Sequence, residues 1–512
     1  MSLYFSLRDL TGGLPKIGEQ TKSSLEPALL NLFQMRAGLP ISLKSIEGLR
    51  VDCVADRATP EKIARLVESD PFLALRLVAL VNQTFYHRGH DIVTVQGAVS
   101  HLGVWKVPEV CADLGDAKSF KAIYLGRSTA SFALQELVFC AALAKRIANL
   151  MAPREGIDQI AYLLAVLGRI GAVLLAYARP NIYCACFFDA FLSETSSFDR
   201  SFKKLLGKTI PEFGVELGRA LALPKRILNS TSLLHIAPWH KRVWAADEGR
   251  EVRIAIGSVH VAYRIASTVT EMKGQSEIDA LVEDMASRIN LKTDVLREAV
   301  GESLAAMIES LNRIGLTALR LPPYVERFTE PIVERDGTIN TRNIKWPGIA
   351  ERMNSFLNEL RACFKTRAQG DEFYYLPQAV HCTLRALIHG LNFDFAMFMR
   401  YSVAGDSLTP YVWLGEEPDG VRELVRSRGK QSGEYMPDVQ ALLQKKAVFT
   451  GDPITPDHWP FAAFPAIARN DVLGVFYAHK HPVSEANALE TQEQVAVIAL
   501  AEEWHDVPSG FY

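Results

Sequence analysis

A helical periodicity that runs through more than half of the chain limits the fold most. From about Leu25 to Leu319, apolar residues recur at spacings of three and four, and strict alternation is rare. Polar caps followed by proline, Thr59-Pro60 and Asp70-Pro71, mark two helix starts. The pattern predicts an all-α region with short helices at 61–68 and 72–81 and longer helices at Leu134–Met151, Ile157–Tyr177, Arg250–Met272 and Val295–Ile314.

The composition changes between Leu321 and Pro347, where four prolines flank a hairpin candidate that turns at Asp336-Gly337. Beyond this linker, helical patterns are followed by short strands rich in aromatic residues. The second region is therefore predicted to be α+β, with a small antiparallel sheet flanked by helices. Its predicted helices are 349–365, 376–389 and 485–504, and its predicted strands are 393–401, 409–414, 447–450, 460–468 and 472–479.

Length and charge exclude several classes of protein. At about 150 residues per domain, a chain of 512 residues has room for two to four domains. A net charge of −2 with 22% charged residues argues against a surface that binds nucleic acid. The seven cysteines are scattered and lack paired CxxC motifs, which is typical of reduced thiols in a cytosolic protein. Arg8 and Asp9 interrupt the N-terminal apolar stretch, so no export signal is expected.

Residues 160–178 are the one segment apolar enough to suggest a membrane span. Arg169 is its only charge, and a charge at the centre of a span costs about 2.5–3.5 kcal/mol on insertion scales. Gly168 and Gly171 suit close packing against a neighbouring helix. We therefore predict a helix buried inside the helical region and no contact with a membrane.

A stretch near the N-terminus carries a family signature. Glu68–Asn82 begins Glu-Ser-Asp-Pro, Phe85-Tyr86 follow, and Ile92–Gly103 ends in Leu-Gly. With Gly38-Leu39-Pro40 upstream, this order resembles the HDOD domain, a bacterial signalling module related to HD-superfamily phosphohydrolases. We interpret the residues that carry the resemblance as structural rather than as a site. They are Asp70, Pro71, Asn82, Phe85, Tyr86 and Gly103.

The resemblance also implies where a metal site should lie. The catalytic relatives hold metal ions with a His, a His-Asp doublet and a later Asp. Here the segment expected to carry the doublet reads Gly168-Arg169, followed by the usual Ile-Gly. Cys140 ends the segment expected to supply the first His, and Tyr263 stands where the later Asp is expected. The resemblance therefore implies no metal, no catalytic residue and no cofactor in this chain.

Two His-Asp doublets occur elsewhere in the sequence, His90-Asp91 and His505-Asp506. The first follows the signature helix in a loop beside Gly89, and the second ends the closing helix just before Pro508. Neither context fits metal binding, so both are interpreted as surface residues.

The region from about Met353 to Asp506 resembles a GAF domain, a cytosolic sensor or dimerisation fold. The resemblance rests on the order of a helix ending at Leu391, an Asn392-Phe-Asp entry into a strand, and Asp471–Tyr477 as a late core strand. Such folds can enclose a pocket against the sheet. Aromatic residues in alternating strands are more often core, so the pocket is an alternative interpretation. Its candidate residues are Arg400, Tyr411, Trp413, His458, Trp459 and Phe464.

These observations predict a multi-domain cytoplasmic protein with an all-α HDOD domain followed by an α+β GAF-like domain. The predicted boundaries are an N-terminal segment at 1–24, the HDOD domain at 25–235, its helical extension at 236–320, a proline-rich linker at 321–348 and the GAF-like domain at 349–512.

The expected function is non-catalytic bacterial signal transduction. In this hypothesis the C-terminal domain senses a signal or forms a dimer, and the helical domain displays or hides a face that binds protein partners. Three alternatives stay open: a metal-dependent phosphohydrolase whose ligands are misaligned, a small-molecule receptor that uses the GAF-like pocket, and a purely structural interaction protein. A homodimer is compatible with each of them.

Overall fold

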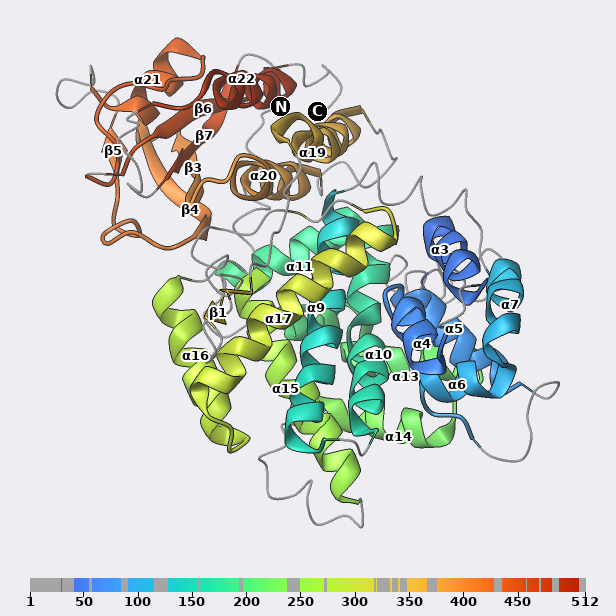
Figure 1. Cartoon of the computed structure of the whole chain (residues 1–512). Coiled ribbons are helices and arrows are strands. Elements are labelled where there is room, and N and C mark those ends of the chain that lie inside the picture. The colour runs from blue at the N-terminus through green and yellow to red at the C-terminus, as the bar shows by residue number, and fades with distance from the viewer. Residues whose placement is uncertain are drawn as a thin grey trace.

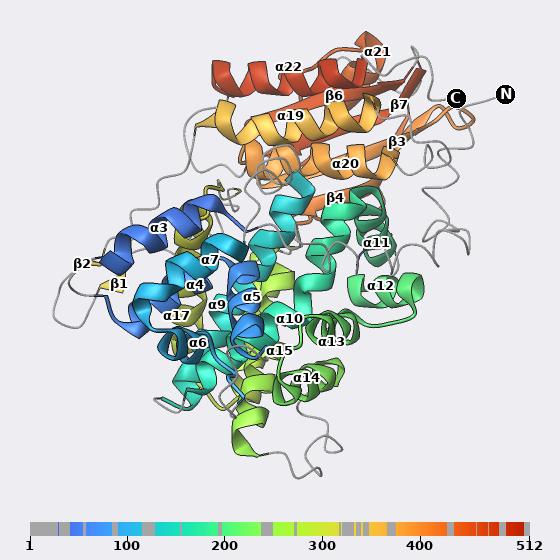
Figure 2. The same cartoon turned by 90° about the vertical axis from the view of Figure 1, so that its right-hand side faces the viewer.

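The computed structural model consists of a helical domain and a C-terminal domain in which helices surround a sheet (Figures 1 and 2). We use "helical domain" for α3 to α17 and "C-terminal domain" for α19 to α22. The structure describes residues 29, 41–54, 58–83, 91–114, 128–153, 156–192, 197–236, 249–270, 274–316, 319, 332–333, 339–340, 348–365, 375–427, 435–456, 458–468, 471–480 and 488–505.

The helical domain is built around α9, and α10, α15 and α17 pack along it (Figure 1). The smaller helices α3 to α7 form a group beside this bundle (Figure 2). The helices are α3 (Leu43–Val54), α4 (Pro60–Glu68), α5 (Pro71–Val81), α6 (Val95–Leu102), η1 (Val104–Lys106), α7 (Val107–Leu114), α9 (Ser128–Met151), α10 (Ile157–Ala178), α11 (Pro180–Leu192), α12 (Phe198–Leu206), α13 (Ile210–Ala220), α14 (Lys225–Ser232), η2 (Leu233–His235), α15 (Arg250–Thr270), α16 (Gln275–Arg288) and α17 (Thr293–Arg313).

The predicted helix starts of α4 and α5 are confirmed. The Thr59 side chain accepts a hydrogen bond from Lys62 N, and Asp70 accepts bonds from the amides of the two residues after Pro71. Each cap thus satisfies amides that have no partner inside their own helix. The four longer helices also form in the predicted regions, although α9 begins at Ser128 rather than at Leu134.

The apolar helix α10 is the core helix that the sequence predicts. By length and mean hydropathy of 2.0 it could cross a membrane, but 94% of its most apolar window is buried inside the protein. A β-carbon at Gly171 would lie 2.9 Å from the Phe213 side chain of α13. Glycine therefore lets the two helices approach closely, as predicted.

The C-terminal domain contains a five-stranded antiparallel sheet with the order β5-β4-β3-β7-β6. Helices α19, α20 and α22 cover one face, and α21 covers the other (Figure 1). Alternate residues of β3 enter the two cores, so Phe398 faces the three helices and Met397 faces α21. The elements are α19 (Ile349–Lys365), α20 (Tyr375–Arg385), η6 (Ala386–Gly390), β3 (Phe395–Ser402), β4 (Ser407–Gly415), β5 (Arg426–Ser427), α21 (Pro437–Gln444), β6 (Phe461–Ala468), β7 (Asp471–His479) and α22 (Thr491–His505).

Three predicted elements differ from the structure. Residues 447–450 are not a strand, because only Val448 forms a bridge, to Ala463 of β6. The closing helix begins at Thr491 rather than at 485. The linker hairpin is confirmed but short, with β1 (Ile332–Val333) antiparallel to β2 (Ile339–Asn340), and its predicted turn lies outside the described residues.

Candidate functional site

Asp70, the centre of the family signature, joins two helices as well as capping one. Its Oδ1 accepts hydrogen bonds from Phe72 N at 3.1 Å and Leu73 N at 3.2 Å. Its Oδ2 accepts bonds from Ser42 N at 2.9 Å and Ser45 Oγ at 3.3 Å, both at the start of α3. Burial raises the pKa of Asp70 to about 6, although these four bonds favour the carboxylate. Asp70 is therefore a structural junction between α3 and α5.

Replacing Asp70 by asparagine should lower the free energy of unfolding at pH 7.5 by about 1–3 kcal/mol, because an amide NH2 would face the Ser42 N–H. The loss should be larger at pH 5. The pKa of Asp70 is higher in the folded protein than in the unfolded chain. Its contribution to the free energy of unfolding is therefore fully present below the unfolded pKa and is lost as pH rises through about 6. Urea unfolding of the wild type and of Asp70→Asn at pH 7.5 and pH 5 tests this prediction. If the two proteins differ in free energy of unfolding by the same amount at both pH values, the raised pKa assigned to Asp70 is wrong.

The remaining signature residues that the structure describes also have structural roles. The Asn82 side chain donates to Val78 O at 2.7 Å and to Ile92 O at 2.8 Å, and accepts from Ile92 N at 2.9 Å. Gly103 ends α6 with a φ of 83°, which favours glycine. Phe85 and Tyr86 lie outside the described residues.

The positions that the resemblance assigns to the metal site meet around Arg169 of α10. Its Nη2 lies 2.8 Å from Glu136 Oε1 of α9, and its Nη1 lies 2.9 Å from Asp199 Oδ1 of α12. The guanidinium carbon stands 4.1 Å from the centroid of the Tyr263 ring of α15, a cation–π contact. Cys140 lies nearby, and burial raises the pKa of its thiol to about 12, so the thiol stays protonated. We call Glu136, Arg169, Asp199 and Tyr263 the Arg169 cluster.

These residues do not fit a divalent metal ion. A guanidinium supplies only donors, and it brings positive charge to the place where a cation would bind. Gly168 has no side chain, and a β-carbon there would lie 2.9 Å from Leu234 Cδ1. Within the part of the chain that the structure describes, no three His, Cys, Asp or Glu side chains are grouped for metal binding.

The sequence analysis missed Glu136 and Asp199. Glu136 is the only acidic residue in the 24 residues of α9, and it is buried. A single carboxylate in an apolar helix is a signal of a buried cationic partner, because an isolated buried charge is costly. Asp199 lies in the first turn of α12, where the sequence gives no comparable signal.

Each of the two other His-Asp doublets is only half inside the described residues. Asp91 is exposed, and His90 lies outside the described residues. His505 is the last residue of α22, and Asp506 is outside the described residues.

The six candidate pocket residues do not surround one cavity. Phe464 is fully buried and stacks on Phe476 beneath the three helices, where Tyr411 also packs. Trp413 and Trp459 pack on the opposite face of the sheet. The remaining two candidates are Arg400, paired in register with Thr409, and His458, whose ring lies 4.6 Å from that of His479. The sheet therefore separates residues that the sequence analysis placed together.

A groove of about 750 Å³ crosses the helical domain between α4, α9, α10 and α17. We call it the α4–α17 groove. Five basic and five acidic side chains line it, so its charges balance. Its lining also includes apolar side chains, among them Leu66 of α4, Ala142 of α9 and Ala306 of α17. The groove therefore suits a ligand or protein segment of low net charge.

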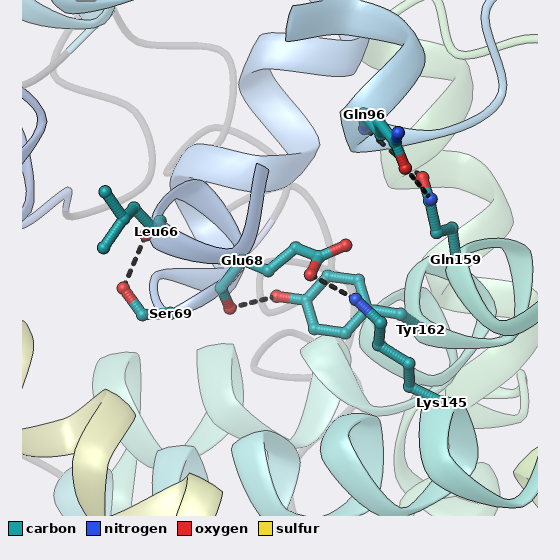
Figure 3. Close-up of polar contacts among 7 residues, drawn as sticks. All are labelled: Leu66, Glu68, Ser69, Gln96, Lys145, Gln159 and Tyr162. Carbon is teal, nitrogen blue, oxygen red and sulfur yellow. Dashed lines mark hydrogen bonds and ion pairs between the residues drawn. The ribbon is translucent and has the colours of Figure 1, made fainter. Parts of the chain in front are cut away.

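One end of the groove is held by contacts between α4 and the bundle (Figure 3). Lys145 Nζ of α9 lies 2.5 Å from Glu68 Oε2, and Tyr162 of α10 donates to Glu68 O at 2.6 Å. Gln159 of α10 bonds with Gln96 of α6 nearby. Burial raises the pKa of Glu68, although the Lys145 ammonium opposes this. These contacts make the groove wall depend on the position of α9.

A buried carboxylate connects the two domains. Both oxygens of Glu359 in α19 accept hydrogen bonds from the start of α9: Ser128 Oγ at 2.5 Å, Thr129 N at 2.8 Å and Thr129 Oγ1 at 2.6 Å. Gln378 of α20 donates to the same carboxylate at 2.8 Å. We call these four residues the Glu359 clasp.

An aromatic contact beside the clasp joins the two cores. The Arg385 guanidinium of α20 lies 3.2 Å from the Phe132 ring centroid of α9, and its Nε donates to His381 at 2.8 Å. Burial, followed by the neighbouring Arg385 charge, holds the pKa of His381 well below its usual range. Phe132, Phe187 and Phe188 of the helical domain belong to the same apolar cluster as the C-terminal helices. The domains therefore share a core.

The bundle and the signature contacts form an all-helical domain, which is followed by an α+β domain. Residues 39–237 match the family model of the HDOD domain, so the chain contains an HDOD domain over these residues. This confirms the resemblance that the sequence analysis identified.

Solved structures with similar folds share little sequence with the chain. The MmoQ response regulator from Methylococcus capsulatus is 16% identical, with 52% of this chain and 98% of that chain covered and a TM-score of 0.37. A virulence factor from Campylobacter jejuni is 18% identical, covering 55% and 99% with a TM-score of 0.38. The GAF domain of an Acinetobacter phosphoenolpyruvate-protein phosphotransferase is 9% identical, covering 30% and 91% with a TM-score of 0.23. No curated protein matches the chain.

Proposed function

We propose that this protein is a non-catalytic bacterial signalling protein whose HDOD domain binds protein partners under the control of a GAF-like C-terminal domain. The Arg169 cluster carries the proposal. The resemblance to HD-type phosphohydrolases implies metal ligands at these positions, and here a buried guanidinium is held by two carboxylates and an aromatic ring. The balanced charge of the α4–α17 groove supports a protein surface as the partner rather than a nucleic acid.

The GAF-like identity of the C-terminal domain belongs to the same proposal. Its support is a small antiparallel sheet with three helices on one face and one on the other. A sensory or dimerisation role for this domain agrees with the shared core, because a signal there would reach the helical domain through buried contacts.

A small-molecule receptor is a second candidate function, favoured by Asp438 at the start of α21. This side chain is fully buried, and no described residue makes a well-aligned hydrogen bond to its oxygens, although the backbone amides of Asp438 and Val439 lie close enough to oppose a rise of its pKa. Arg426 Nε lies 3.6 Å from Oδ2, and burial raises the pKa of Asp438. A ligand with hydrogen-bond donors would satisfy this carboxyl.

The test of the first proposal is metal content together with hydrolysis. The full chain, purified without chelator and without added metal, should contain far less than one equivalent of iron, manganese or zinc. With manganese supplied, it should not hydrolyse bis(p-nitrophenyl) phosphate above the rate of a matched sample of denatured protein. Near-stoichiometric metal with turnover would contradict the proposal and restore the phosphohydrolase alternative.

A further inference from the structure

The longest helix among the described residues, α9, receives a capping carboxylate from the other domain. The first amides of a helix lack partners inside it, and a residue just before the helix usually supplies the cap. Here Glu359, 230 positions away, accepts from Thr129 N, and its negative charge lies at the positive end of the helix dipole. Gln378 fixes the carboxylate from its other side. The start of α9 is thus stabilised by the C-terminal domain.

Further along, α9 contacts each functional region in turn. Gln135 exchanges two hydrogen bonds with the backbone of Leu319, close to the linker, at 3.1 and 2.8 Å. Glu136 binds Arg169 one position later. Lys145 and Arg146 then reach the α4–α17 groove. At a rise of about 1.5 Å per residue, the helix spans about 24 Å from the clasp to Lys145.

At the groove, α9 holds both walls. Lys145 binds Glu68 of α4 on one side, and Arg146 Nε lies 2.5 Å from Glu302 Oε2 of α17 on the other. The Arg146–Glu302 pair is about one-third exposed, so it can be exchanged at modest cost. The Glu68 side chain is only 8% exposed, so release of Lys145 leaves a buried carboxylate without its cation. A small shift of α9 along its axis would therefore alter the spacing of both walls.

We infer that the C-terminal domain regulates the α4–α17 groove mechanically through α9, with the Glu359 clasp as the point of control. This inference rests on the proposed signalling function and names its route of regulation. When the clasp is closed, α9 is capped and Lys145 is held against Glu68. When a signal moves α19 away, the first turn of α9 loses its cap, and the groove wall at Lys145 loosens.

The experiment compares the full chain with Glu359→Ala and with Asn358→Ala, a matched control on the exposed face of α19. Acylation of lysines with a water-soluble acetyl ester, read by mass spectrometry, should increase several-fold at Lys145 in Glu359→Ala only. Lys208, which pairs with Glu216 away from the groove, should not change. Hydrogen exchange should be faster both in the first turn of α9 and around Lys145.

Two outcomes would overturn the inference. One is faster exchange confined to the first turn with unchanged labelling of Lys145, because the clasp would then be only a local cap. The other is an equal effect in Asn358→Ala. If Glu359→Ala does not fold, Gln378→Ala weakens the same clasp and should give a smaller change of the same sign. Metal content and hydrolysis are measured on the same samples. Failure of the non-catalytic proposal can therefore be distinguished from failure of the inference about the Glu359 clasp.

Discussion

Replacing Arg169 by methionine should lower the free energy of unfolding by roughly 3–5 kcal/mol, because removing one partner of a buried pair leaves an uncompensated charge. The Glu136 and Arg169 side chains are only 10% and 8% exposed, so water cannot replace the lost guanidinium. The substitution also removes the cation–π contact to Tyr263. Denaturant unfolding of the full chain, followed by far-UV circular dichroism, measures the loss.

A double substitution separates the cost of the orphaned charge from the loss of packing. Arg169→Met with Glu136→Met removes both buried charges and fills the space with side chains of similar length, a change that is often neutral or stabilising. The double variant should therefore recover most of the stability that the single variant loses. A single variant as stable as the wild type would contradict the role assigned to the Arg169 cluster. A double variant no better than the single one would assign the loss to packing instead.

Local signals explain which helices could be predicted from the sequence. The caps at Thr59 and Asp70 act within three residues, so the starts of α4 and α5 are found correctly. The start of α9 is different: the predicted helix begins at Leu134, whereas α9 begins at Ser128. Ser128 and Thr129 are residue types favoured at a helix start, but the carboxylate that accepts from Thr129 N, Glu359, belongs to the other domain. Helix ends that depend on tertiary contacts are therefore the ends that the sequence does not reveal.

The same distinction holds for the site. The family resemblance identifies four positions where metal ligands are expected, and the structure brings them together. They are Cys140, Gly168, Arg169 and Tyr263. The carboxylates that neutralise Arg169 come from helices on either side of it in sequence, so their spacing carries no motif.

The pocket is the alternative interpretation of the sequence, and its candidate residues lie on two faces of the sheet for a geometric reason. Its aromatic residues were grouped without regard to the two faces of the sheet, and Tyr411 occupies a bulge in β4 that shifts the alternation. Val412 and Pro410 are paired with successive residues of β3, so Tyr411 is the extra residue. Pro410, beside Tyr411, is the one local signal of this bulge, because a proline inside a strand cannot donate to the ladder.

Replacing Gly214 by alanine should destabilise the helical domain by more than the roughly 1–3 kcal/mol typical of overpacking. A β-carbon at Gly214 would lie 2.1 Å from the Leu167 carbonyl oxygen, so α13 would have to move away from α10, which carries Arg169 two residues after Leu167. Gly257 of α15 is the matched control, since it is also inside a helix but has no atom within 4 Å of the added carbon. Gly257→Ala should stabilise the protein by about 0.5–1 kcal/mol through helix propensity. Thermal unfolding should therefore shift in opposite directions for the two variants. If both variants lose a similar amount of stability, glycine at these positions provides only general flexibility. If their melting temperatures shift in opposite directions, close backbone contact at Gly214 determines how α10 and α13 cross.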